Sequence, residues 1–408
     1  MSLKLILNSQ AVNFKLSNMK KIGAGGEGSV FLLRNSLESY ALKLYHKPTQ
    51  ERFKKVRAAI EARPSNSIYK HGSDAIVQMA WPVGLVQKNG KDVGFAMPYI
   101  NPKTTLNLDY FIHPILGKDR RHPEKPNLAV RLQIAHNLCS LVKSLHDSGH
   151  YFIDFKPANV QVYPKSLHIC LIDCDSYSIN FDGNRYPATA YSPLFINPIA
   201  LVNNIHPSNL GEEQDNWAIA VGLFTLLNFA LHPYDGIGSG SVNITETDGF
   251  VRMGLYAYGF TQNPLVSPKP QSVHRLWPNE VRTLFDKAFT DPQNAPSMSM
   301  WINCIKEILD NKKISRCTKK PKSVDHLKFE GFECMQCAYD GRQKSKLIVT
   351  KPKLIKPSLQ PSVIHTPTSI HRPPVIHTPP NVSSSSQSTG YKWVVVFFIV
   401  IALLMIFN

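Results

Sequence analysis

The sequence predicts an α+β fold in which a small β-rich part is followed by a larger helical part. Within residues 21–100, two short β-leaning apolar runs at 30–33 and 40–45 indicate strands. Residues 128–146 carry apolar side chains at helical spacing, which indicates an amphipathic helix. Hydrophobic residues make up 43% of the chain, enough for a packed core, so wholesale disorder is excluded.

Four more segments complete the expected helices. Residues 49–63 have helical spacing, begin at the capping residue Thr49 and stop before a proline. Residues 216–231 are nearly all apolar but too short and too internal to span a membrane, so we expect a buried helix. Residues 281–289 and 298–309 are expected to close the helical part.

Length, charge and cysteine content narrow the classes of protein. At 408 residues the chain is long enough for two or three structural units. Lys and Arg number 46 against 29 Asp and Glu, a net charge of +17 that suits anionic partners. Residues 341–392 hold eight Lys or Arg and no acidic residue, so part of the charge belongs to a basic tail, and we do not expect nucleic-acid binding. The seven cysteines are scattered and the first twenty residues lack a secretory signal, which favours a reduced, cytosolic compartment.

A glycine-rich motif lies at the start of the β-rich part. Gly23, Gly25 and Gly28 fit the pattern G-x-G-x-x-G. Val30 follows two residues later, and because this region is β-leaning, the loop should join two strands and cover phosphates with its backbone amides. A dinucleotide-binding fold would instead place a helix after the glycines. A hairpin without a ligand is the other alternative.

Three further polar motifs follow in order. Lys43 lies inside the second apolar run, where a buried ammonium group needs an anion such as a nucleotide phosphate, unless it points to solvent. After the long helix the chain reads I-D-F-K-P-A-N-V, which contains Asp154, Lys156 and Asn159. The next run, C-L-I-D-C-D, contains Asp173. In this order and at these intervals, the motifs resemble those of the protein kinases.

The resemblance extends over about residues 20–309. D-x-K-x-x-N resembles the kinase catalytic loop, and the following I-D step resembles the strand end that carries the metal-binding Asp of D-F-G. Later, D-N-W-A at 215–218 resembles the D-x-W-x-x-G element, and H-P-Y at 232–234 resembles the H-P-F turn. The resemblance implies a two-lobed protein-kinase-like fold, with an N-lobe at 17–100 and a C-lobe at 101–310.

The function that the resemblance implies is that of an ATP-dependent Ser/Thr protein kinase using Mg²⁺, with Mn²⁺ as an alternative ion. Asp154 would accept the substrate hydroxyl proton and Lys156 would steady the transferred phosphate. Asn159 and Asp173 would hold the metal, since hard cations prefer oxygen ligands. The residues implied to bind ATP are Gly23, Gly25, Gly28, Val30, Lys43, Met97, Pro98 and Ile100.

Residues 97–100 resemble the hinge that holds adenine, with Met97 as the gatekeeper. Adenine recognition needs backbone groups two residues apart. Pro98 lacks an N–H but keeps its carbonyl, and Ile100 supplies an N–H, so the proline is tolerable here.

A narrower resemblance is to a bacterial subgroup of eukaryotic-like kinases that carry D-x-D-S-[FY] in place of D-F-G, as at 173–177. Members of that subgroup often occur beside von Willebrand A-type and PP2C-type phosphatase proteins, which are therefore the implied protein partners. They commonly carry a small Cys/His module after the kinase domain.

Several positions depart from the kinase pattern. Residues 152–153 are Phe-Ile where the family has His-Arg, so a phosphate on the activation segment would lose its usual partner. Asp175 replaces the glycine of D-F-G and could bind a second cation or cap the turn. The helix glutamate that pairs with Lys43 is expected at Glu61, with Glu51 as the alternative.

These departures leave two other functions open. One is a nucleotide-binding pseudokinase or scaffold in a signalling complex. The other is a small-molecule kinase, because residues 192–195, where a peptide would dock, are also altered.

A second constellation lies at 314–342, after the expected kinase domain. Cys317, His326, Cys334 and Cys337 offer three thiolates and one imidazole, a ligand set that suits tetrahedral zinc. The Cys-x-x-Cys pair is its stronger half. Four unrelated residues in a basic linker and a redox pair are the alternatives.

The end of the chain predicts a linker and a membrane anchor. Residues 343–390 are rich in Pro, Ser, Thr, His and Lys and contain VIHTP twice, so we expect a disordered linker. Residues 393–407 are fifteen consecutive apolar residues, short for a bilayer core of about 30 Å but flanked by interfacial residues. We therefore expect a single transmembrane helix at 391–408 with the kinase domain on the cytosolic side, in the inner membrane if the organism is bacterial. A buried core helix is the alternative.

Overall fold

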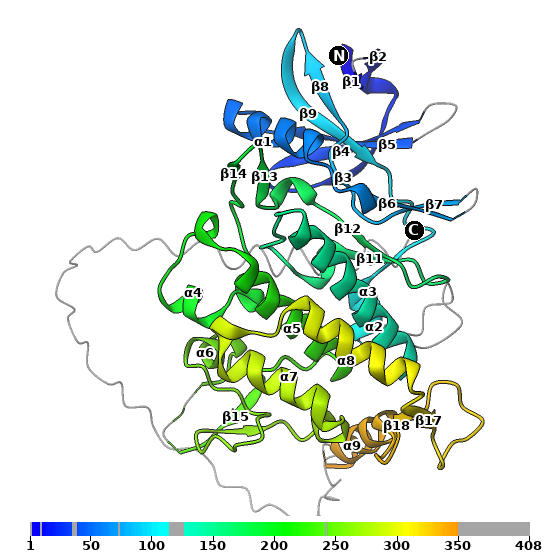
Figure 1. Cartoon of the computed structure of the whole chain (residues 1–408), viewed down its shortest axis with the longest axis vertical. Helices are drawn as coiled ribbons and strands as arrows, with labels where there is room; N and C mark the ends of the chain where they lie inside the picture. The colour runs from blue at the N-terminus through cyan, green and yellow to red at the C-terminus, as the bar shows by residue number, and fades with distance from the viewer. Residues whose placement is uncertain are drawn as a thin grey trace, which may run out of the picture. The chain divides into compact units, whose positions relative to one another are not determined.

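The computed structural model describes residues 2–349, apart from 9, 35–38, 72–73, 114–125, 241 and 243. The chain divides into two units, 1–352 and 353–408, and all described residues belong to the first. That unit has a β-rich N-terminal lobe and a larger helical C-terminal lobe, which confirms the predicted α+β, two-lobed architecture (Figure 1).

Part of the predicted tail lies in a described helix. The anchor at 391–408 and the linker from residue 350 onward lie outside the described residues. Residues 343–349, expected as the start of the linker, instead continue helix α9 (Met335–Val349). The reason is that four of these seven residues are Gln, Lys or Leu, which sustain a helix that has already begun.

The N-lobe is a seven-stranded antiparallel sheet in the order β2-β1-β8-β9-β5-β4-β3. The predicted strands at 30–33 and 40–45 lie within β4 and β5, which pair along their whole lengths. Two strands precede the expected boundary at residue 17, because Leu3 and Leu5 of β1 are buried in the sheet's core. The strands are β1 (Ser2–Leu7), β2 (Gln10–Lys15), β3 (Lys20–Ala24), β4 (Gly28–Arg34), β5 (Ser39–Tyr45), β8 (Gly84–Lys88) and β9 (Lys91–Pro98).

One long helix, α1 (Gln50–Glu61), packs beside this sheet (Figure 1). The predicted cap is present, since the Thr49 hydroxyl accepts a hydrogen bond from the Arg52 N–H at 3.3 Å. Phe53 and Val56 are buried against Tyr45 and its neighbours on the sheet. Apolar contacts therefore fix the helix next to the strand that carries Lys43.

Trp81 joins the two lobes. Its side chain is fully buried, and its indole N–H donates to the carbonyl of Ala59 in α1 at 2.6 Å. On the other side its ring lies 5.3 Å from the ring of His150 and 6.2 Å from that of Tyr177, both in the C-lobe. A hairpin of β6 (Ile68–His71) and β7 (Asp74–Val77) precedes it.

The C-lobe is built around two helices, α3 (Leu128–Asp147) and α5 (Glu212–Leu227). Every residue of α5 from Gln214 onward is buried, which agrees with the predicted internal helix. The helix ends earlier than predicted, because Phe229 adopts a left-handed φ of 52° that no α-helix continues. The other helices are α2 (Leu108–Ile112), α4 (Pro198–Val202), α6 (Thr247–Arg252), α7 (Asn279–Thr290) and α8 (Met298–Asp310), the last two close to the predicted closing helices.

Short strands carry the connections between these helices. A three-stranded sheet has the strand order β10-β11-β12. The loop with Asp154 and Asn159 directly precedes its strand β11, and Asp173 comes just after its strand β12. A separate hairpin, β13-β14, follows it and packs against α1. The strands are β10 (Leu106–Asn107), β11 (Val160–Val162), β12 (Ile169–Leu171), β13 (Ile179–Phe181), β14 (Asn184–Tyr186), β15 (Gly236–Gly238), β16 (Val266–Pro268), β17 (Ile314–Arg316) and β18 (Leu327–Phe329).

Within the described part of the chain, no helix combines the length and the apolar character needed to cross a bilayer.

Candidate active site

The glycine loop connects β3 to β4 as a strand–loop–strand hairpin, as the sequence predicts. The N–H of Gly25 donates to the carbonyl of Gly28 at 2.9 Å, which closes the loop. A Cβ at Gly28 would lie 2.5 Å from a carbonyl oxygen of β5, so packing requires glycine there, whereas a Cβ at Gly25 would meet no atom within 4 Å. Gly23 pairs with Val30, and Val30 pairs with Lys43 on β5. The loop is thus open around Gly25 and packed tightly against β5 at Gly28.

Lys43 binds carboxylates from the other lobe. Its side chain is 10% exposed, and its amino group lies 2.9 Å from Asp173 Oδ1 and 2.8 Å from Asp175 Oδ2. Glu27 of the glycine loop lies farther away, at 3.6 Å. The Tyr45 hydroxyl also donates to Asp175 Oδ2, at 2.8 Å. Burial alone would lower the pKa of Lys43, but the charges of the two aspartates outweigh it and raise that pKa above its usual value, so the amine is cationic.

Neither predicted helix glutamate reaches Lys43. Glu51 is 80% exposed and pairs with a neighbouring lysine at 2.8 Å, and Glu61, the last residue of α1, is exposed. On this fully described helix a cation, Lys55, is half-buried and donates to the carbonyl of Pro187 at 2.9 Å. Burial lowers the pKa of Lys55 to about 8. Spacing along the chain therefore led to the wrong partner for the strand lysine.

The predicted catalytic residues lie together on the loop that ends in a 3₁₀ turn before β11. Asp154 is buried, and its Oδ2 binds the Lys156 amino group at 3.0 Å. Its Oδ1 accepts a hydrogen bond from the Ser192 hydroxyl at 2.6 Å. The side-chain amide of Asn159 donates to the Asp154 carbonyl at 3.1 Å. Ser192 is a contact that sequence reasoning missed, because it had assigned that residue only to an altered docking region.

Asp215, from the D-x-W element, binds the backbone of this loop just before Asp154. Its side chain is fully buried and accepts hydrogen bonds from the N–H groups of Phe152 and Ile153 at 2.6 and 2.7 Å. His146, at the end of α3, lies 2.9 Å from the same carboxylate. Ile153 has a φ of 58°, a left-handed conformation that is strained for a β-branched residue. The buried carboxylate thus fixes the backbone that precedes Asp154.

The two predicted metal ligands are linked through the backbone, since the Ile172 N–H donates to the carbonyl of Asn159 at 3.0 Å. Asp173 is left-handed, with a φ of 61°, and its side chain is 43% exposed. The amide nitrogen of Asn159 is engaged by Asp154, which leaves its Oδ1 as a possible ligand. One exposed carboxylate and one oriented amide oxygen fit a hard cation such as Mg²⁺.

The predicted hinge at 97–100 begins in the last two residues of β9. Met97 pairs with Ala41 on β5, two residues before Lys43, and packs against the apolar cluster that includes Tyr45. Pro98 ends the strand, and Ile100 follows it, half-buried.

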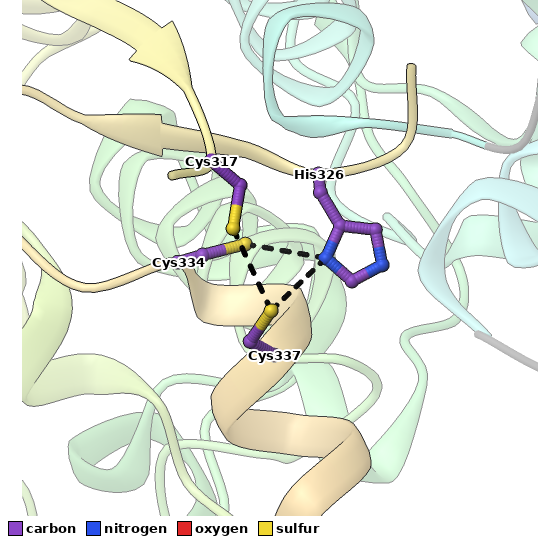
Figure 2. Close-up of side chains that lie close together, drawn as sticks. All are labelled: Cys317, His326, Cys334 and Cys337. Carbon is purple, nitrogen blue, oxygen red and sulfur yellow. Dashed lines mark hydrogen bonds between the residues drawn. The ribbon is translucent and has the colours of Figure 1, made fainter. Parts of the chain in front are cut away.

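The second constellation also comes together. The candidate ligand atoms of Cys317, His326, Cys334 and Cys337 all lie within 4.8 Å of one another (Figure 2). Sγ of Cys317 lies 3.6 Å from that of Cys337, and Nδ1 of His326 lies 3.2 Å from Cys337 Sγ and 3.6 Å from Cys334 Sγ. A tetrahedron with zinc–sulfur bonds of about 2.3 Å has edges of about 3.8 Å, so these spacings fit zinc.

This Cys/His module is part of the folded unit. Phe329 on β18 and Met335 at the start of α9 belong to the main core of the C-lobe. The ring of Tyr339 lies 4.6 Å from that of Phe229, beyond the end of α5. The module therefore packs on the C-lobe.

Comparison with known proteins agrees with this geometry. The family model described as "Protein kinase domain" matches residues 16–326, more than half of the chain, and the chain belongs to that family. It is 28% identical over 344 residues to protein kinase YegI of Escherichia coli O157:H7, across 79% of this chain and 49% of the relative. Against protein kinase YegI of E. coli strain K12 the identity is 27%, across 79% of this chain and 48% of the relative. The chain thus spans about half the length of the curated relatives it matches.

Proposed function

We propose that the chain is an ATP-dependent Ser/Thr protein kinase that uses Mg²⁺, with Mn²⁺ as an alternative ion. The observation that carries the proposal is the buried carboxylate of Asp154, held by Lys156 at 3.0 Å, together with the Lys43–Asp173 contact between the lobes. Membership of the protein kinase family supports the same reaction class, and both relatives are named as protein kinases.

Each residue has a physical role in this reaction. Asp154 would accept the proton of the substrate hydroxyl, which would replace the Ser192 hydroxyl on Oδ1. Lys156, on the other oxygen, would neutralise charge on the transferred phosphoryl group. Lys43 would bind the α and β phosphates beneath the glycine loop. Asn159 and Asp173 would hold the metal ion, which neutralises phosphate charge when it is bound.

A nucleotide-binding pseudokinase or scaffold is the second candidate, and one observation favours it. Lys43 is already engaged by two aspartates, so the phosphates of ATP would compete with Asp173 for the lysine and displace it. In a scaffold this displacement would allow ATP binding without turnover.

For location, we propose a single membrane helix at 391–408, with the kinase domain at the cytosolic face. The fifteen consecutive apolar residues at 393–407 support it. Von Willebrand A-type and PP2C-type phosphatase proteins are proposed as partners from the subgroup resemblance alone.

The function is tested with the full-length protein. Cell membranes are separated first, and we expect the protein in the carbonate-resistant pellet unless residues 391–408 are deleted. The purified protein is then incubated with γ-labelled ATP, Mg²⁺ or Mn²⁺, and a general protein acceptor such as casein. Label in phosphoserine and phosphothreonine is expected.

Other results of this experiment would favour one of the alternative functions or contradict the membrane anchor. ATP binding without transfer with either ion favours the scaffold, and label found only in small molecules favours a small-molecule kinase. A full-length protein that stays soluble without detergent contradicts the anchor.

We also propose that the Cys/His module holds a structural zinc ion. Metal analysis of the full-length protein should give about one zinc per chain, because three thiolates and an imidazole at tetrahedral spacing bind zinc tightly. The double variant Cys334→Ser, Cys337→Ser removes the Cys-x-x-Cys half and should contain almost none.

Cys304→Ser is the matched control, since Cys304 lies on α8 outside the cluster. The zinc site is rejected if the wild-type chain is purified without zinc, or if the double variant keeps it.

A further inference from the structure

Lys43 has an unusual set of partners. In protein kinases the strand lysine that binds the phosphates of ATP must be paired with a carboxylate, which a helix glutamate supplies. On α1, all of whose residues are described, Glu51 and Glu61 point to solvent or to a neighbouring lysine. That helix instead places the half-buried cation Lys55 against the carbonyl of Pro187. The aiming carboxylate must therefore come from elsewhere.

Asp175 meets the requirements for that carboxylate. Both of its oxygens bind the Lys43 amino group, at 2.9 and 2.8 Å. Its side chain is only 4% exposed, whereas that of Asp173 is 43% exposed. The short 3₁₀ turn Cys174–Ser176 carries it, directly after the residue proposed to bind the metal.

The surroundings of Asp175 fix it in this place. Tyr45, two residues after Lys43 on the same strand, donates its hydroxyl to Asp175 Oδ2 at 2.8 Å. The Tyr45 ring packs against Phe53 of α1, with 5.8 Å between ring centroids. A carboxylate so enclosed, with the lysine and the phenol as its donors, has little room to turn toward a metal ion.

We propose that Asp175 is the residue that positions Lys43 in this protein, in place of a helix glutamate. The two aspartates then have different roles, one toward the metal and one toward the lysine. Exposed Asp173 leaves the lysine for the metal when nucleotide binds, and buried Asp175 stays and keeps the amine aimed at the phosphates. The inference rests on the proposed phosphoryl transfer for its rate measurements.

The test is a double-mutant cycle in the full-length protein. Asp175→Asn keeps the shape of the side chain and should lower kcat by about 10²-fold, the usual scale for a reacting group held in the wrong place. Lys43→Met should lower kcat further, and Asp175→Asn added to it should change kcat by less than about threefold, since contacting residues that act as a unit are not additive. The KM for the protein acceptor should stay constant. Effects that multiply in the double variant overturn the proposal.

Magnesium dependence separates positioning from a second cation site. With Asp175→Asn, the Mg²⁺ concentration that gives half the maximal rate should remain within about twofold of wild type, because the residue does not touch the ion. A larger shift assigns Asp175 to the metal instead and overturns the proposal. Asp182→Asn is the matched control, because Asp182 is an exposed aspartate in the neighbouring hairpin turn, and it should leave both values unchanged.

If the wild-type chain binds ATP without transferring phosphate, the kinase proposal fails, and the same cycle is measured on ATP dissociation constants. The effect of Asp175→Asn on the ATP dissociation constant should then differ by at least about threefold between the wild-type and the Lys43→Met background. Equal effects in the two backgrounds overturn the positioning role. If Asp175→Asn does not fold, Tyr45→Phe decides: it keeps both charges and should lower kcat by about threefold to tenfold, and an unchanged kcat overturns the proposal.

Discussion

Replacing Asp173 by asparagine should lower kcat for phosphoryl transfer by at least about 10³-fold while the protein stays folded. A metal ion on the transferring phosphates is worth several kcal/mol of charge stabilisation, and about 4 kcal/mol corresponds to that factor. Asparagine keeps one oxygen but loses the negative charge that holds the ion. The fold should survive, because the Asp173 side chain is 43% exposed and its ion pair is with Lys43, which keeps Asp175. Rates at saturating ATP over a range of Mg²⁺ concentrations measure the effect.

The Asp182→Asn variant serves again as the matched control and should keep the wild-type rate. Partial recovery of Asp173→Asn at high Mg²⁺ or Mn²⁺ would agree with weakened metal binding. A variant within tenfold of wild type at every metal concentration would contradict the assignment of Asp173 as a ligand. Loss of the cooperative thermal transition would mean that the carboxylate acts on the fold instead.

Local patterns predicted the elements that depend on neighbouring residues. The apolar runs at 30–33 and 40–45 lie in β4 and β5, and the period of residues 128–146 matches α3 almost to the residue. Two elements were missed although their signals are present in the sequence. Leu3 and Leu5 alternate with exposed residues in the manner of a half-buried strand, and Asp182-Gly183 is a typical hairpin turn between β13 and β14.

The contacts that depend on the folded arrangement could not be predicted in the same way. Lys43 meets Asp175 across 132 residues of sequence, and Asp154 meets Ser192 across 38. Spacing along the chain pointed to a glutamate on α1, but which face of that helix meets the sheet is decided by Phe53 and Val56 packing on the strands. The order of motifs was enough to name residues that the fold brings together as a candidate site, and only the geometry assigned partners among them.

The second large effect is expected at Asp215, which sets the shape of the catalytic loop. Asp215→Asn should lower the free energy of unfolding by about 2–5 kcal/mol, because the fully buried carboxylate accepts three hydrogen bonds and an amide can accept through one oxygen only. The new NH₂ group would face an N–H donor of Phe152 or Ile153, or the ring of His146. Urea unfolding of the full-length protein measures the loss.

The same substitution should also lower kcat by about 10²-fold in the protein that remains folded. Ile153 is held at a φ of 58°, and a strained residue of this kind costs about 1–3 kcal/mol and persists only where its surroundings enforce it. Once the hydrogen bonds from the two backbone N–H groups to Asp215 weaken, the loop can relax and move Asp154 out of alignment. Misplacement of a general base lowers the rate strongly. Asp286→Asn is the matched control, because Asp286 also accepts a backbone N–H, from Phe260 at 3.0 Å, but far along the chain from this loop. If Asp215→Asn loses stability and keeps the wild-type kcat, Asp215 supports the core of the C-lobe and does not set the catalytic loop.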